Sequence, residues 1–363
     1  MSDSQEEIIS LVNTMFEVDQ FTKNLYSLEF KILDKDFKMK FEELARKIED
    51  LNYFCRLEKM DDGKYIIIQK FPQRKRRRFL GSSWTPRILF IVVVGFVMFD
   101  GYIRTEDANS IIAIGNPLEM AGIYTLSLLG ILGVHESGHL IAAKAHRLKT
   151  SWPYFIPGIP VVGIPTFGAF IQSKGLTINR EILFDVAIAG PIAGLVIAII
   201  VSMYAAYTAP VIEDNIAQGL FDEARLHESI LEQPILMQAS FALFGKGDDM
   251  VVLQTPLLFA AWVGFLITFL NLLPAWQLDG GHLARTLLGP KLHSYATYGS
   301  MAVLVLLDFW PMALLILFLS SRSPSASPLD DISPLSKNRK IAYVGVIVLA
   351  VLCAPIPSGF LPW

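Results

Sequence analysis

Long apolar runs separated by short polar stretches fill the chain from about residue 87 onward, whereas the first part mixes apolar and charged positions at short intervals. A membrane-spanning helix needs about 20 predominantly apolar residues. Four runs of this kind predict spans at about Ile88 to Ile103, Leu118 to Ala145, Ile182 to Ala206 and Pro256 to Leu273. We therefore expect a polytopic α-helical membrane protein.

The number of spans beyond the fourth is open. His293 to Ser321 predicts either one long span or two short ones broken at Asp308 to Pro311, and Ile341 to Leu352 predicts a final span. Positive residues concentrate on the cytoplasmic side of membrane proteins. A basic group between the two segments favours a cytoplasmic loop there, and hence two spans: Arg322, Lys337, Arg339 and Lys340. Six or seven spans are expected, with seven preferred.

Residues 1–73 have the pattern of a small α+β domain. The predicted elements are a helix over 4–16, a strand over Asn24 to Leu33, a helix over Phe41 to Leu51, and a hairpin of Phe54 to Met60 and Lys64 to Phe71. The pattern contains no catalytic constellation, so a docking or regulatory role and a merely solubilising one are both open. A basic linker, 74–86, joins this domain to a membrane-embedded domain, 87–358.

Composition supports this division. The chain is 53% hydrophobic and only 18% charged, which excludes an ordinary soluble enzyme. Residues 1–78 hold 16 of the 31 Lys and Arg and 15 of the 34 Asp and Glu. Five consecutive basic residues, Arg74 to Arg78, precede the first span and predict a cytoplasmic N-terminal domain, with the cell membrane as the location. Because the positive charge is confined to this cluster, nucleic-acid binding is not expected.

The second predicted span contains a metal-binding motif. His135, Glu136, Ser137, Gly138 and His139 spell H-E-x-G-H. On a helix, positions i and i+4 share a face, so the two histidines can hold one Zn²⁺ while Glu136 accepts a proton from water. Ionisable groups are costly in a span and usually persist there for function. The two cysteines, Cys55 and Cys353, are too few for a cysteine-based zinc site.

The orientation of this span predicts how deep in the membrane the motif lies. The span ends at basic residues, Lys144, His146, Arg147 and Lys149, which predict a cytoplasmic end. The histidine pair then lies about 10 residues, or about 15 Å, from the inner boundary at the helical rise of about 1.5 Å per residue. We therefore expect the metal in the cytoplasmic half of the bilayer.

A proline- and glycine-rich stretch, Trp152 to Ser173, follows the motif. Prolines and glycines alternate in it, so it cannot form a regular helix. It is nevertheless apolar, which predicts a re-entrant loop or hairpin packed against the bundle beside a water-filled cavity. Gly168 to Gln172 could supply an exposed strand edge.

A third metal ligand is needed, because catalytic zinc sites have three protein ligands and leave one position for water. Asp279 is the leading candidate, since it follows the helix-stopping Pro274 and precedes two glycines that permit a tight turn. Asp185 and Glu181 are competing donors. The alternative for Asp279 is an ordinary loop acid at a membrane boundary.

These motifs together resemble the site-2 protease family of intramembrane zinc metalloproteases. The H-E-x-G-H helix followed by Asn271-Leu272-Leu273-Pro274 and Leu278-Asp279-Gly280-Gly281 carries the resemblance, which extends over about Leu118 to Ile332. Further segments are similar to the archaeal, cyanobacterial and plastid subgroup: Thr166-Phe167-Gly168-Ala169-Phe170, Asn179-Arg180, Phe184-Asp185, Ala189-Gly190-Pro191 and Gln277-Leu278-Asp279-Gly280-Gly281-His282. No PDZ-like insertion is apparent.

The resemblance implies specific roles. One Zn²⁺ per chain would be bound by His135, His139 and Asp279, with Glu136 as general base and then acid. Asn271 matches an asparagine thought to position substrate near the metal, and a helix-end cap or interhelical hydrogen bond is its alternative. The subgroup often has a small residue where Trp276 stands, so access to the metal could differ here. The implied partners are a transmembrane protein substrate and the lipid bilayer, while the oligomeric state is open.

Two other functions are compatible with the residues. One is a membrane metalloprotease that uses H-E-x-x-H with a distant glutamate and cuts soluble peptides, and Asp279 distinguishes it. The other is a metal transporter or metal-sensing receptor. The glutamate next to the first histidine favours hydrolysis over transport.

Overall fold

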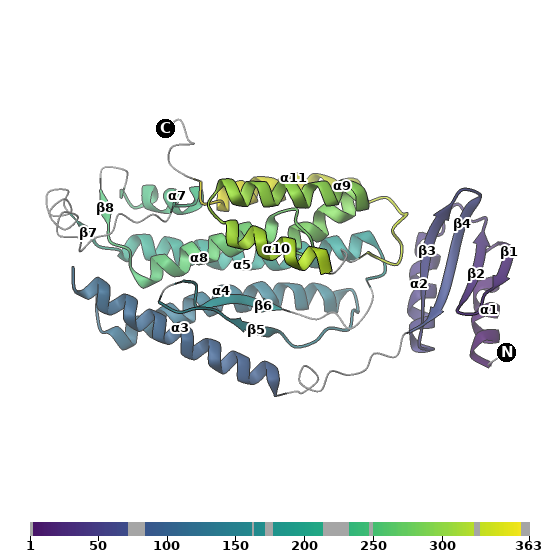
Figure 1. The fold of residues 1–363 in the computed structure, drawn as a ribbon, viewed down its shortest axis with the longest axis horizontal. Coiled ribbons are helices and arrows are strands. Elements are labelled where there is room, and N and C mark those ends of the chain that lie inside the picture. Colours follow the sequence, from purple (N-terminus) through teal and green to yellow (C-terminus); the bar gives the residue numbers. More distant parts are fainter. Residues whose placement is uncertain are drawn as a thin grey trace.

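The fold is known from a computed structural model, which describes residues 3–71, 84–161, 163–170, 177–212, 232–246, 250–322 and 327–356. The basic run 74–78 and the end of the expected strand edge at Gln172 lie outside the described residues. Figure 1 shows a small sheet with two helices at one end of a bundle of long helices. The expected combination of a helical membrane part and an N-terminal α+β domain is therefore confirmed.

The N-terminal domain is a four-stranded antiparallel sheet with two helices. Its elements are α1 (Asp3–Met15), β1 (Val18–Lys23), β2 (Ser27–Ile32), α2 (Lys38–Asp50), β3 (Tyr53–Met60) and β4 (Gly63–Lys70), in the strand order β1-β2-β4-β3. Apolar side chains alternate along β2 and face the buried side of α2, which presents Phe41, Leu44 and Ile48. These side chains share one apolar core with residues of α1 and β4.

Strand β1 was not predicted from the sequence. It is an edge strand in which only Val18 is partly buried and every following residue is exposed. An exposed edge strand need not alternate apolar and polar residues, because neither of its faces is covered. The expected strand over Asn24 to Leu33 corresponds to β2 alone, which begins after the turn.

The remaining described helices form the bundle. They are α3 (Thr85–Asn109), α4 (Pro117–Ala145), α5 (Arg180–Thr208), α7 (Ile235–Leu243), α8 (Pro256–Leu272), α9 (Asp279–Leu306), α10 (Trp310–Arg322) and α11 (Lys337–Cys353). Three of them, α3, α4 and α5, are long and apolar enough to cross a membrane by length and composition, and α8 and α10 are shorter apolar helices. Two short strands, β7 (Val211–Ile212) and β8 (Val251–Val252), pair beyond the end of α5. The total of six or seven spans stays a prediction.

The segment around Asp308 contains two helices. Helix α9 ends at Leu306, Asp308 has a left-handed backbone with φ of 62°, and α10 starts at Trp310. Helix α9 also begins earlier than the expected span, at Asp279, and is interrupted at Gly289, where φ is 76°. Gly289 and Pro290 together explain the interruption, because glycine accepts this conformation and proline cannot continue the hydrogen-bond ladder.

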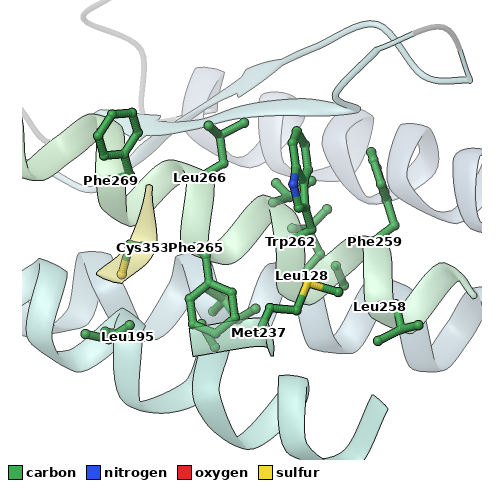
Figure 2. Close-up of a cluster of buried hydrophobic side chains, with 14 of the residues drawn as sticks. Leu128, Leu195, Met237, Leu258, Phe259, Trp262, Phe265, Leu266, Phe269 and Cys353 are labelled. Atoms are coloured by element: carbon green, nitrogen blue, oxygen red, sulfur yellow. The ribbon is translucent and has the colours of Figure 1, made fainter. Parts of the chain in front are cut away.

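Helix α8 is the central element of the bundle. Of its 17 residues, 14 are buried, so apolar side chains leave it in every direction. Figure 2 shows Phe259, Trp262 and Phe269 on one side of α8 and Leu258 and Phe265 on the other. These side chains pack with residues of α4, α5, α7 and α11 in one cluster. A helix that is hydrophobic all round is one that neighbouring helices enclose, and this position fixes the C-terminal end of α8 inside the bundle.

The proline- and glycine-rich stretch forms an antiparallel hairpin, as expected for its described part. Strands β5 (Tyr154–Pro157) and β6 (Thr166–Phe170) pair with each other, and the ladder continues through hydrogen bonds from the Gly158 and Ile159 amides to the Pro165 and Ile164 carbonyls, at 3.0 and 2.9 Å. The sheet has these two strands alone among the described residues. Strand β5 lies along α3, and β6 also contacts α4 (Figure 1).

The N-terminal domain contacts the bundle where α4 ends and α5 begins. On α2, Lys38 pairs with Glu181 at 2.9 Å and Arg46 donates to the His146 carbonyl at 3.3 Å. The Leu57 amide of β3 donates to the Leu329 carbonyl at 2.9 Å, so the segment before α11 extends the sheet of the N-terminal domain. Ile182 of α5 is part of the domain's apolar core. Sheet, helix ends and core are thus continuous across this junction.

Candidate metal centre

Helix α4 positions the two histidines of the motif. Asn116 caps its first turn by accepting from the Leu118 and Glu119 amides at 2.9 and 3.3 Å, and the helix then runs unbroken to Ala145. His135 and His139 lie one turn apart, with their Nε2 atoms 3.2 Å from each other. Both side chains are largely buried, at 5% and 14% exposure. The expected shared face of the helix is present.

Asp279 reaches the same point from another part of the chain. Its Oδ2 lies 3.3 Å from the Nε2 of His135 and 3.2 Å from the Nε2 of His139. The chain leaves α8 at Leu272, turns tightly, and enters α9 at Asp279. A Cβ on Gly280 would overlap the Leu272 carbonyl, and one on Gly281 would overlap the Ala275 carbonyl. The two glycines therefore permit the turn that carries Asp279 to the histidines.

The geometry of the three donors fits a tetrahedral zinc ion. Ligand bonds to Zn²⁺ are about 2.0 to 2.1 Å, so two ligands at a tetrahedral angle are about 3.3 to 3.4 Å apart. The three donor atoms form a triangle with sides of 3.2, 3.3 and 3.2 Å. Within the described residues, this is the group of histidine, cysteine and acidic side chains that could hold a metal ion. Two imidazoles and a carboxylate also leave a fourth position open, as catalytic zinc requires.

Helix α5 orients the second histidine. The Nδ1 of His139 lies 2.8 Å from the Val186 carbonyl oxygen. Because a carbonyl only accepts, Nδ1 carries the proton and donates, which leaves the Nε2 lone pair directed at Asp279 and at the metal position. Hydrogen bonds of this kind fix the ring and raise the basicity of a metal-binding imidazole.

Three glycines allow α4 and α5 to approach closely at this point. A Cβ on Gly190 would overlap the His139 ring, and one on Gly194 would lie 2.9 Å from the Cβ of His135. A Cβ on Gly138 would lie 2.5 Å from the Ala189 carbonyl oxygen. The glycines of α5 are four residues apart and face the histidines of α4, which have the same spacing. Small residues at four-residue spacing are typical of close helix contacts in membranes.

Glu136 and Asn271 lie at the same centre. Glu136 is next to the first histidine on α4 and is only 8% exposed. The Nδ2 of Asn271, near the end of α8, is 3.4 Å from the Nε2 of His135. An amide nitrogen at this distance lies beside the metal position, where it can donate to an oxygen of a bound group. The geometry also fits the alternative role of Asn271, an interhelical hydrogen bond, since Asn271 and His135 belong to different helices.

The competing acids lie elsewhere. Arg339 of α11 holds the Asp185 carboxylate with two hydrogen bonds of 2.7 Å, and His146 contacts it at 3.1 Å. Glu181 pairs with Lys38 and with Arg339, at 2.9 and 3.3 Å. Both acids therefore join the N-terminal domain, α5 and α11 at one end of the bundle rather than the histidine pair.

Some contributors to the site were not predicted from the sequence. The Val186 carbonyl could not be predicted, because a backbone acceptor has no sequence signature. Gly190 and Gly194 had a signal in their four-residue spacing, but their position opposite the two histidines was not predicted. Trp276 stands in the turn before Asp279 with φ of 44°, an unusual conformation for a bulky residue, and its amide donates to Thr297 at 3.0 Å.

Fold and site together define a helical membrane protein in which two histidines and an aspartate that could hold a metal ion meet between the helices. Comparison with protein families gives the same class: residues 123–307 match the model of peptidase family M50, and the chain belongs to that family. The matched range includes both histidines, Asn271 and Asp279. The resemblance to site-2 proteases is confirmed at this level.

Curated relatives come from plants. The chain is 31% identical over 240 residues to the probable zinc metalloprotease EGY2, chloroplastic, of Arabidopsis thaliana, covering 63% of this chain and 41% of that protein. It is 32% identical over 237 residues to EGY1 of the same plant, covering 63% and 42%, and 31% identical over 252 residues to EGY2 of Oryza sativa, covering 66% and 44%. The chain thus spans less than half the length of these relatives.

Proposed function

We propose that this chain is an intramembrane zinc metalloprotease that hydrolyses peptide bonds of membrane-spanning substrates in or near the cytoplasmic half of the bilayer. The observation that carries the proposal is the triangle of donor atoms from His135, His139 and Asp279. The buried Glu136 directly follows the first of these histidines on α4. One Zn²⁺ per chain would occupy the triangle. The names of the plant relatives, which are probable zinc metalloproteases, support the choice of metal and reaction.

Each residue has a distinct task in this reaction. Zinc, when bound, supplies a positive charge that polarises the peptide carbonyl and lowers the pKa of water. Glu136 accepts the proton of the attacking water and then donates it to the leaving amine. Asn271 is placed to hold the substrate carbonyl through its amide nitrogen. The side chains of His135, His139 and Asp279 are only 5%, 14% and 17% exposed, which limits the access of other water to the site.

The position of Asp279 also favours this function over its rivals. A protease with a distant glutamate would take its third ligand from another acid, whereas Asp279 already lies 3.2 to 3.3 Å from both imidazoles. A transporter needs a metal that enters and leaves. A site that holds the metal with three ligands and has a general base next to it is suited to hydrolysis rather than to transport.

A substrate helix hides its carbonyls in its own hydrogen bonds, so it must unwind before it is cut. The unwound segment could pair with the free edge of β6, because this strand pairs only with β5 among the described residues and lies against α4. Such pairing would satisfy the freed backbone groups inside the bilayer. The substrate would then lie along β6, beside the helix that carries His135 and His139.

Proline replacements in β6 should distinguish the role of its free edge from the role of the edge that pairs with β5. Successive residues of an antiparallel strand direct their N–H groups alternately toward the partner and away from it. One of Ala169 and Phe170 therefore directs its amide to the free edge. Ala169→Pro and Phe170→Pro should therefore have different effects. The variant whose amide faces the free edge should cleave a single-span peptide about tenfold more slowly without loosening the hairpin, since a single substrate-pairing bond is lost. The other variant should loosen the pairing of β6 with β5. Amide exchange of residues 154–170 and cleavage rate measure the two effects, and equal cleavage by both variants and the unmodified chain would reject strand pairing.

Orientation and location follow from charge. The basic end of α4, with Lys144 and Arg147, lies on the same side of the bundle as the N-terminal domain, because Arg46 contacts the carbonyl of His146 there. Positive residues prefer the cytoplasmic side, so we place the N-terminal domain in the cytoplasm. The cell membrane remains the expected location, which charge alone does not identify. The plant relatives are named chloroplastic.

Reconstitution of the purified chain with single-span peptides tests the proposed function directly. We expect products whose masses place the cut within the apolar span, loss of the products after zinc chelation, and their return when zinc is added. A zinc content of one ion per chain is expected in the same preparation. Cleavage of soluble peptides alone would favour the distant-glutamate type of protease, and zinc binding without any cleavage would favour transport or sensing.

A further inference from the structure

A second buried charged group lies away from the metal centre, on α3. Asp100 is completely buried and Arg104, one turn later, has about a quarter of its side chain exposed. Both belong to a helix that is apolar and long enough to span a membrane. Charged residues inside a span are expensive and are usually retained for a function. The proposed hydrolysis has no use for this pair.

Both carboxylate oxygens of Asp100 accept hydrogen bonds from specific donors. Its Oδ2 accepts from the Tyr124 hydroxyl of α4 at 2.7 Å and from the Nε of Arg104 at 2.8 Å. Its Oδ1 accepts from the backbone amide of Val161 at 2.7 Å. Three donors, one of them a cation, compensate the burial of this carboxylate. The carboxylate thus joins α3 and α4 to the tip of the β5–β6 hairpin.

Arg104 adds two contacts to the same junction. One guanidinium nitrogen lies 3.4 Å from the Gly163 carbonyl oxygen at the hairpin tip. The guanidinium carbon also lies 3.5 Å from the ring centre of Phe259 on α8, a cation–π contact. The hairpin tip is therefore held at Val161 and at Gly163 by one ion pair, which also contacts Phe259 of α8.

The backbone at the tip shows that an external restraint acts on it. Val161 has φ of 68°, a left-handed conformation that is a genuine outlier for a β-branched residue. Such conformations persist only where surrounding contacts impose them. The contact made by the Val161 backbone is the hydrogen bond to Asp100. Close packing of Gly101 against Tyr124 keeps the two helices at the distance that this bond requires.

The hairpin is anchored to α3 at its other end as well. Phe155 of β5 packs on Phe90 with ring centres 5.0 Å apart. The contacts with Phe90, Asp100 and Arg104 therefore align the hairpin along α3 over more than three turns of the helix. Because β6 pairs with this anchored strand and contacts α4, the same contacts restrain the position of β6 along the helix that carries the two histidines.

We propose that Asp100, together with Arg104 and Tyr124, is a positioning group that holds the hairpin tip so that β6 presents its free edge to the substrate at a fixed register with the metal centre. This inference rests on the proposed function, because β6 is taken to receive the substrate. Asp100 touches no reacting atom. Its loss should raise KM about tenfold, since a mobile strand pairs less well with substrate, while kcat changes little. The cut should also spread to neighbouring peptide bonds.

The test uses the full chain and three variants of α3 and α4. Asp100→Ala removes all three bonds, Asp100→Asn keeps an oxygen for the Val161 amide, and Tyr124→Phe removes one hydroxyl and leaves the other bonds in place. Asp107→Asn is the matched control, since Asp107 is an exposed acid on the same helix. Hydrogen exchange of residues 154–170, zinc content, KM, kcat and product masses for a single-span peptide are measured on each.

We expect faster exchange at the hairpin in Asp100→Ala, a smaller increase in Asp100→Asn and Tyr124→Phe, unchanged zinc content, and KM values that rise in the same order. Tyr124→Phe keeps the test valid if Asp100→Ala does not fold. Unchanged exchange in the variants would overturn the anchoring of the tip, and faster exchange with unchanged KM and product masses would overturn its role in positioning. Absence of cleavage by the unmodified chain would instead overturn the proposed function, because exchange is measured without substrate.

Discussion

Exchanging Glu136 for glutamine should lower the rate of peptide cleavage by about a thousandfold or more while zinc stays bound. Glutamine has nearly the same size but cannot accept the proton of the attacking water, and a positioned general base contributes about 10² to 10⁴-fold to such reactions. The donor triangle of His135, His139 and Asp279 does not include Glu136, so metal affinity should change little. The effect should fall on kcat, because Glu136 acts in the transition state rather than in binding substrate.

Zinc content by elemental analysis and product formation from a single-span peptide, both on purified protein, measure this prediction. Glu119→Gln is the matched control, because Glu119 is an exposed acid in the first turn of the same helix. The control should cleave at the rate of the unmodified chain. Cleavage at the unmodified rate by Glu136→Gln would remove Glu136 from the mechanism. Loss of zinc from this variant would make Glu136 a ligand instead of a base.

Much of the fold could be predicted because its signals are local. An apolar run was sufficient for α4, whose observed bounds differ from the expected span by one residue at its start. The shared face of His135 and His139 likewise follows from helical periodicity alone. Alternation was sufficient for β3 and β4, but not for β1, whose exposed residues carry no pattern.

The approach of distant segments was harder to predict. That Asp279 lies near the histidines was inferred from a turn signal and from resemblance, and the structure shows the three side chains together, while their ligation of zinc stays a prediction. The ion pair of Asp100 and Arg104 lies within or just past the expected first span, yet no function was inferred for it. Its partners are a backbone amide and a carbonyl about 60 residues away, and backbone partners cannot be identified from residue types.

The glycines of α5 offer a sharper test of the site than its ligands do. Gly190→Ala should weaken zinc binding by about 10 to 100-fold, the loss typical of disturbing groups that orient a ligand. Helix propensity alone predicts that this replacement stabilises α5, since alanine favours the helix by about 1 kcal/mol over glycine. The steric effect should dominate, because the new methyl group would overlap the His139 imidazole. Either the ring rotates away from the triangle, or α5 withdraws and the Val186 carbonyl no longer orients it.

Zinc affinity, measured by competition with a chromogenic chelator, gives the result without any assay of cleavage. Gly130→Ala on α4 is the control, because a Cβ at Gly130 would meet nothing within 4 Å, and this variant should bind zinc normally. Gly194→Ala should have a smaller effect than Gly190→Ala, since its methyl would lie 2.9 Å from the His135 Cβ, at the base of the side chain rather than in the ring. Normal affinity in Gly190→Ala would mean that α4 and α5 separate freely. The close helix contact would then not be what holds His139 in place.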